Sequence, residues 1–187
     1  MTWDEPMIRY ELEKLDEITG LEGSSLKIQF INGYSKDFLA QYHCICGNRF
    51  FLFNNKYFSN VDFPVNDALD VIRHEYAHYM NDMIYHNYEH DYTWKICCRL
   101  IGACPLEFYK EGSAKYFYEL YQKEKTIWPE YEKYKVADLI LHPQYGLGII
   151  SSIDGPVFSR RIDVDFESGI SKRLGLSWVH NNCKRVA

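Results

Sequence analysis

One short stretch of the sequence carries the side chains of a metal site: His74, Glu75 and His78 form the pattern H-E-x-x-H. On a helix that turns about 100° per residue, the two histidines lie about 40° apart, so both imidazoles can reach one ion. Two imidazoles with a third protein ligand and a water suit Zn²⁺, which lowers the pKa of the bound water. The pattern therefore predicts a zinc cofactor, with Glu75 as general base and not as a ligand.

Three residues are candidates for the third zinc ligand. His86 follows on the same helix, about 120° round from His74, so it is poorly placed to bind the same ion. His90 lies beyond a polar turn, which lets the chain fold back onto the metal. Glu111 opens an E-G-x-A-x-Y-F segment that resembles the downstream segment of gluzincin peptidases, where a glutamate from a later helix completes the zinc site.

The motif needs a helix, and the sequence predicts one from Pro64 to about Tyr85. Its apolar side chains recur at steps of three and four and form a stripe on the side away from the histidines. A second helix is expected from near Asp91 to Gly102, and a third from Leu106 to about Lys125. The residues of the apolar stripe are Leu69, Ile72, Tyr76, Tyr79 and Met83.

The residues before the motif predict a helix and a small sheet. A leading helix over 4–19 has Asp4 at its start and Gly20 at its end. Strand-like stretches follow, and the last two are separated by a tight turn at Cys46-Gly47-Asn48, so we expect a small antiparallel sheet. Its edge near Arg49 to Phe53 is a candidate for pairing with an extended substrate. The strand-like stretches are 26–31, 38–45 and 49–53.

Residues from about 4 to 105 resemble a SprT-like metallopeptidase domain, the family that includes the Spartan DNA–protein crosslink proteases. The resemblance implies a zincin-like fold, with His74, His78 and His90 as zinc ligands and Glu75 as general base. The sequence differs from the family in Asp91, where glycine is usual, and in the absence of the paired cysteines of a C-terminal zinc ribbon. The likeness rests on the leading helix, the small sheet, residues 70–78, His90, Trp94, Lys95 and residues 100–102.

Trp94 follows His90 by four residues and therefore shares its helical face. We expect its indole to pack against the motif helix and not to bind substrate. Loss of this side chain should loosen the site.

The composition changes at Val136, where short β-branched runs broken by Gly and Pro begin. These runs resemble the SH3-like, Tudor-type β-barrel at the C-terminus of UvrD-type helicases. The chain then divides into a metallopeptidase domain at 1–133 and a barrel at 134–187 that binds a partner, with DNA or a DNA-bound protein as candidates. The expected strands are 138–141, 148–153, 161–166 and 170–174, and the resemblance rests on residues 142–148, 163–169 and 172–174.

The composition excludes several classes of protein. Apolar residues are 47% and charged residues 25% of the 187, which argues against a disordered or low-complexity chain. No stretch approaches the about 20 uncharged apolar residues that cross a bilayer, and the acidic start lacks a signal-peptide pattern. We therefore expect no membrane contact and a cytoplasmic location, with the six cysteines reduced.

Together, the residues predict an α+β chain and a zinc-dependent endopeptidase that hydrolyses protein substrates, including DNA-associated or crosslinked proteins. One alternative is a gluzincin-type zinc peptidase with Glu111 as third ligand. Another is a catalytically silent adaptor that zinc stabilises. Glu75 argues against the adaptor, because a purely structural site has no use for a base beside an open ligand position.

Overall fold

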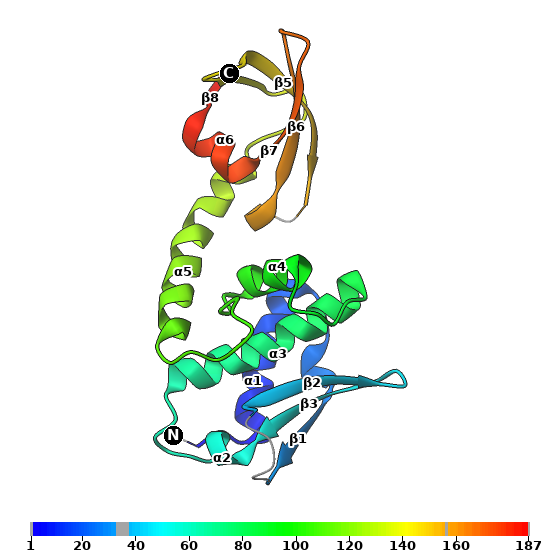
Figure 1. Cartoon of the computed structure of the whole chain (residues 1–187), viewed down its shortest axis with the longest axis vertical. Helices are drawn as coiled ribbons and strands as arrows, with labels where there is room; N and C mark the ends of the chain where they lie inside the picture. The colour runs from blue at the N-terminus through cyan, green and yellow to red at the C-terminus, as the bar shows by residue number, and fades with distance from the viewer. Residues whose placement is uncertain (1, 33–37, 156, 187) are drawn as a thin grey trace. The chain divides into compact units, whose positions relative to one another are not determined.

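The structure is a computed structural model that describes residues 2–32, 38–155 and 157–186. These ranges contain six α-helices and two β-sheets, so the expected α+β class is confirmed. The chain divides into two compact units, Met1–Tyr121 and Gln122–Ala187, called here the N-terminal and the C-terminal unit (Figure 1). The division falls inside helix α5 (Ser113–Tyr131) and thus before the boundary expected after residue 133.

Helix α1 (Glu5–Thr19) has the predicted ends. The Asp4 carboxylate accepts a hydrogen bond from the Met7 N–H, and Gly20 closes the helix in the left-handed region at φ 71°. These are local signals, because each cap satisfies backbone groups of its own helix. Ile18, expected on the buried stripe, is 41% exposed. The buried side chains of the helix are Ile8, Leu12 and Leu15.

The sheet of the N-terminal unit has the strand order β1-β3-β2 and is mixed, so the expectation of an antiparallel sheet was wrong. Strands β2 and β3 form the predicted antiparallel hairpin, with Cys46 and Gly47 of the turn at positive φ. Strand β1, however, pairs in parallel with the other side of β3. The strands are β1 (Lys27–Ile31), β2 (Ala40–Ile45) and β3 (Asn48–Asn54).

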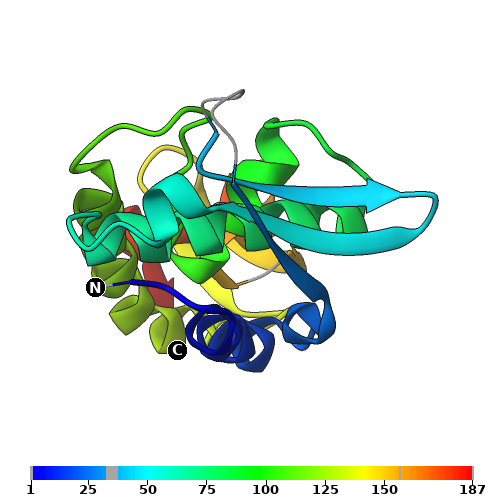
Figure 2. The same ribbon diagram turned by 90° about the horizontal axis from the view of Figure 1, so that it is seen from below.

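This order also corrects the expected substrate edge. Residues 49–53 lie on the central strand β3, whose Phe51 and Phe53 are fully buried. This strand has no free edge, because it pairs with β1 on one side and with β2 on the other. The tight turn determines only the β2–β3 pair, while the position of β1 depends on contacts distant in sequence. The free edges are therefore β1 and β2. In two perpendicular views the tip of the β2–β3 hairpin extends past the helices (Figures 1 and 2).

Helix α3 (Val65–Tyr85) carries the motif and begins directly after Pro64, as predicted. The hydroxyl of Tyr76, on the buried stripe, donates to Asp16 Oδ1 of α1 over 2.6 Å. Met83, also expected on the stripe, is 39% exposed. The contact with α1 fixes the rotation of α3 and so the direction of the motif side chains. The remaining helical segments of this unit are α2 (Asn55–Phe58), α4 (Tyr92–Ile101), the first part of α5 and the 3₁₀ turn Gly23–Ser25.

The helix expected from Leu106 begins only at Ser113. Two side chains of α3 hold the preceding segment in an irregular path: Asp70 Oδ1 accepts from the Cys104 N–H over 2.8 Å, and Asp67 Oδ2 accepts from the Tyr109 hydroxyl over 2.5 Å. These bonds join residues far apart in sequence, so the local helical pattern did not reveal them.

The C-terminal unit is an antiparallel sheet with the strand order β7-β6-β5-β4-β8. The four predicted strands are present, but helix α6 and strand β8 were not predicted. The elements are β4 (Leu139–His142), β5 (Gly146–Asp154), the 3₁₀ turn Val157–Ser159, β6 (Arg161–Phe166), β7 (Ser171–Gly175), α6 (Leu176–Asn182) and β8 (Lys184–Val186).

The expected closed barrel is absent from the described residues of this unit, because no strand pairing joins β7 to β8. Helix α6 connects these two edge strands and packs into the core through Leu176 and Val179, which are both fully buried. Side chains of the helix thus cover apolar residues that a closed sheet would enclose.

All six cysteines have free thiols, and Cys97, Cys98 and Cys104 are buried. Within residues 2–32, 38–155 and 157–186, no helix has both the length and the apolar character needed to cross a bilayer.

Candidate metal centre

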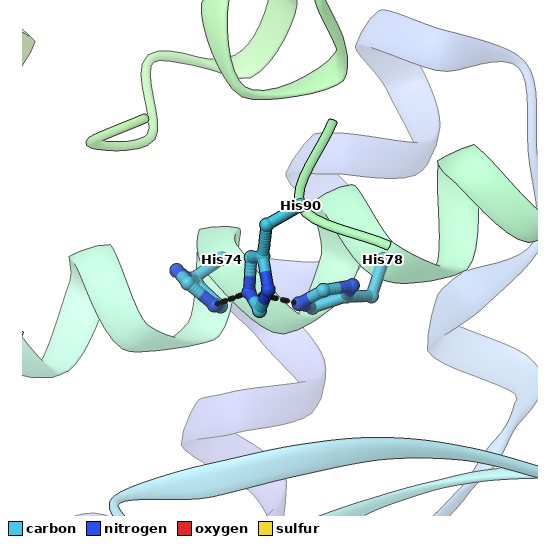
Figure 3. A group of neighbouring side chains, drawn as sticks. All are labelled: His74, His78 and His90. Atoms are coloured by element: carbon cyan, nitrogen blue, oxygen red, sulfur yellow. Dashed lines mark hydrogen bonds between the residues drawn. The ribbon is translucent and has the colours of Figure 1, made fainter. Parts of the chain in front are cut away.

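Three imidazoles converge in the N-terminal unit. His74 and His78 come from α3, and His90 reaches between them from the loop before α4 (Figure 3). The Nε2 atom of His90 lies 3.0 Å from Nε2 of His78 and 3.3 Å from Nε2 of His74. Two nitrogens bound tetrahedrally to one Zn²⁺ at about 2.0–2.1 Å lie about 3.3 Å apart. The donor set and its spacing therefore fit a shared zinc ion.

The surroundings favour the neutral, ligating form of these histidines. Burial, with a smaller contribution from the neighbouring imidazoles, lowers the pKa of His74 to about 3 and that of His78 to about 4. Burial also lowers the pKa of His90. A neutral imidazole keeps a lone pair for a metal ion, whereas a protonated one has none to offer.

Glu75 lies beside the three imidazoles and not among them. Its carboxyl is buried, and Oε2 accepts a hydrogen bond of 2.6 Å from the backbone N–H of Tyr42 on strand β2. Burial raises the pKa of Glu75 to about 8, and the bond from Tyr42 opposes that rise. The carboxyl lines the same cleft of about 470 Å³ as the three imidazoles. The Tyr42 N–H of β2, a strand that carries none of the three histidines, thus holds the carboxyl where a base would act.

The other two candidate ligands lie elsewhere. His86 is exposed and ends α3 in the left-handed region at φ 52°, and Glu111 is exposed in the segment before α5. Neither belongs to the cluster of ligand atoms, which lie within 4.8 Å of one another. In the part of the chain that the structure describes, His74, His78 and His90 are the one group of three or more such ligands.

Backbone and side-chain bonds hold the loop that carries His90. The amide of Asn81, on the last turns of α3, donates to the Glu89 carbonyl over 3.3 Å. The Asp91 carboxylate accepts from the Thr93 and Trp94 N–H groups over 2.9 and 3.3 Å and caps α4. Asp91 therefore stabilises the helix start next to His90.

Trp94 packs against the histidines of the motif helix, as expected, although His90 precedes the N-cap Asp91 and so does not share a helical face with it. The indole is fully buried, and its ring centroid lies 4.8 Å from His74, 5.4 Å from His78 and 4.5 Å from His90. It contacts all three imidazoles at once, so it restricts their rotamers before metal binds.

Replacing Trp94 with phenylalanine should weaken zinc binding by about tenfold, because packing that orients ligands contributes to metal affinity. The affinity is measured by competition with a chromophoric chelator. The matched control is Trp3→Phe, since Trp3 is also buried but precedes α1, where its backbone N–H donates to the Phe58 carbonyl. Equal zinc affinities in the two variants would contradict the role given to Trp94.

Sequence reasoning missed Asp82, one helical turn after His78. Its carboxylate is buried and accepts from three elements: the Tyr42 hydroxyl at 2.6 Å, Arg49 Nε at 2.7 Å and the Tyr88 hydroxyl at 2.9 Å. Burial tends to raise the pKa of Asp82, but these donors hold it below its usual value. Asp82 thus ties β2, β3 and the His90 loop to α3, and only its spacing from His78 could have indicated it.

Removing this carboxylate with Asp82→Ala should lower the free energy of unfolding by about 3 kcal/mol, because three donors lose a buried charged acceptor. Denaturant unfolding measures the change. The control is Asp154→Ala, which breaks the exposed pair with Arg173 and should cost less than about 1 kcal/mol. Similar losses in both variants would show that the Asp82 network contributes little.

No protein-family model matches this chain, and no curated protein matches it significantly. The interpretation of the site therefore depends on its own geometry and on the residues of the motif.

Proposed function

We propose that this chain is a zinc-dependent endopeptidase that hydrolyses protein substrates in the cleft of the N-terminal unit. The observation that carries the proposal is that three converging imidazoles and the buried Glu75 carboxyl share one cleft. A purely structural zinc site has four protein ligands and no adjacent base. In the described part of the chain, His74, His78 and His90 form a set of three, which leaves a coordination position for substrate or water.

The proposed zinc ligands are His74, His78 and His90. When bound, Zn²⁺ supplies Lewis acidity, which activates water and polarises the carbonyl of the scissile bond. Glu75 takes the proton of the attacking water and delivers it to the leaving amine. The Tyr42 N–H holds Oε2 of Glu75, so the proton is carried at Oε1.

Strand β2 gives the substrate backbone a surface to pair with. Residues of an antiparallel strand alternate between facing the partner strand and facing away from it. The Tyr42 N–H points away from β3, because it donates to Glu75. The N–H and C=O groups of Ala40 and Cys44 share this outward direction, so an extended peptide can add to the edge and present its carbonyl to the site.

The order of elements supports a zincin-like arrangement of the N-terminal unit, as in SprT-like peptidases. A leading helix, a sheet with an edge strand beside the motif helix and a loop with the third histidine follow in sequence. The exposed position of Glu111, outside the histidine cluster, favours this arrangement over the gluzincin one.

The C-terminal unit is proposed to bind a partner, and protein is the favoured class. Three of its basic side chains are paired with acids of the same unit: Lys133 with Glu130 at 2.6 Å, Arg173 with Asp154, and Arg185 with Asp138 at 2.8 Å. Such pairs reduce the positive charge that a nucleic acid would meet. Cleavage assays with and without DNA decide whether DNA-bound proteins are the substrates.

The proposed activity is tested with an unfolded, fluorescently labelled protein. The zinc-loaded chain should cleave it, a chelator should abolish cleavage, and added zinc should restore it. A chain that binds one equivalent of zinc but cleaves no peptide bond would overturn the proposal and favour the zinc-stabilised adaptor.

A further inference from the structure

The cleft extends from the histidines along one half of α3. Strand β2 runs in the same sense as α3: Tyr42 contacts Glu75, whereas Arg49, paired opposite Cys44, contacts Asp82 near the end of the helix. The start of β2 therefore lies beside the N-terminal half of α3. Phe38 and Leu39 before β2 and Val71 of α3 line this part of the cleft.

The opposite wall of the cleft is the segment between α4 and α5. Both ribbon views show this segment running alongside α3 (Figures 1 and 2). The bonds from Cys104 to Asp70 and from Tyr109 to Asp67 fasten it at two points. Leu106, Glu107 and Phe108 lie between these points and line the cleft. The wall is thus held in place although it is not helical.

The lining of this part of the cleft is apolar and acidic. Leu106 is 38% exposed and Phe108 77% exposed, so apolar surface remains open to a ligand. The acidic side chains that line the described cleft are Asp70, Glu75 and Glu107, and no lysine or arginine lines it. Burying an apolar side chain here is favourable, whereas a carboxylate would meet like charge and apolar surface.

We propose that this part of the cleft is a specificity subsite for a bulky apolar side chain of an extended peptide. The proposal rests on the proposed function and names its substrate class: segments with aromatic or large aliphatic residues beside the scissile bond, and not acidic segments. Leu106 and Phe108 provide the apolar contact, and Glu107 rejects acidic side chains.

Binding is measured on the zinc-loaded Glu75→Gln protein, which holds a peptide without cleaving it. Two labelled decapeptides differ only in a central Phe or Glu, and fluorescence anisotropy gives their dissociation constants. We expect the Phe peptide to bind about tenfold more tightly. Equal binding of the two peptides, or binding of neither, would overturn the subsite.

Substitutions in the segment between α4 and α5 test whether this wall causes the preference for the Phe peptide. In the same background Leu106→Ala should reduce the ratio between the peptides several-fold, and Glu107→Gln should strengthen binding of the Glu peptide. The matched control is Ile18→Ala, because Ile18 is 41% exposed, close to the 38% of Leu106, but lies on α1. A ratio unchanged by Leu106→Ala would contradict the assignment.

Failure of the subsite and failure of the activity give different results. If the zinc-loaded wild type cleaves an unfolded protein at sites without an apolar preference, the subsite is wrong and the peptidase stands. If it cleaves nothing while the Phe peptide still binds preferentially, the peptidase is wrong and the apolar groove remains as a peptide-binding site.

Discussion

Glu75→Gln is expected to keep zinc bound and to slow peptide hydrolysis by about 10²–10⁴-fold. Glutamine has nearly the same shape, and its amide oxygen can still accept the hydrogen bond from the Tyr42 N–H. It cannot take a proton from water at neutral pH, so only the proton transfer is lost. Initial rates on the labelled protein are compared with zinc content measured by elemental analysis.

The control for this substitution is Glu17→Gln, which changes an exposed glutamate of α1. It should match the wild type in both rate and zinc content. Full activity of Glu75→Gln would show that another group acts as the base. Loss of zinc from the same variant would show that Glu75 is a ligand.

His90→Ala is expected to weaken zinc binding by more than about 100-fold, the upper end of the loss caused by removing a partner outside the ligand shell. The remaining pair, His74 and His78, cannot hold the ion as tightly, because the third nitrogen at 3.0–3.3 Å from theirs is gone. Chelator competition measures the affinity of each variant.

Glu111→Ala, measured beside His90→Ala, distinguishes the two candidates for the third ligand. The Glu111 carboxylate lies outside the cluster, so its removal should leave zinc affinity unchanged. The reverse result, zinc lost from Glu111→Ala and kept by His90→Ala, would favour the gluzincin arrangement and contradict the ligand set proposed here.

Much of the N-terminal unit could be predicted because its signals are local. Asp4 and Gly20 at the ends of α1, and Asp91 and Gly102 at the ends of α4, act on backbone groups of their own helices. The spacing of the motif also placed His74 and His78 on one helix face.

What the sequence did not predict depends on contacts distant in the chain. The parallel pairing of β1 with β3, which makes β2 the edge beside α3, involves strands that no tight turn joins. The irregular segment before α5 exists because Asp67 and Asp70 bind it from α3. Helix α6, which lies between the edge strands β7 and β8 in sequence, was not predicted either. Its Leu176 is buried only through contacts in the folded core, which a local pattern does not show.

The most direct test of the central claim, that His74, His78 and His90 bind zinc together, is X-ray absorption at the zinc edge of the zinc-loaded protein. The predicted spectrum has three imidazole nitrogens and one further light atom at about 2.0–2.1 Å. A sulfur shell at about 2.3 Å, or a fit with fewer than three imidazoles, would contradict the proposed site.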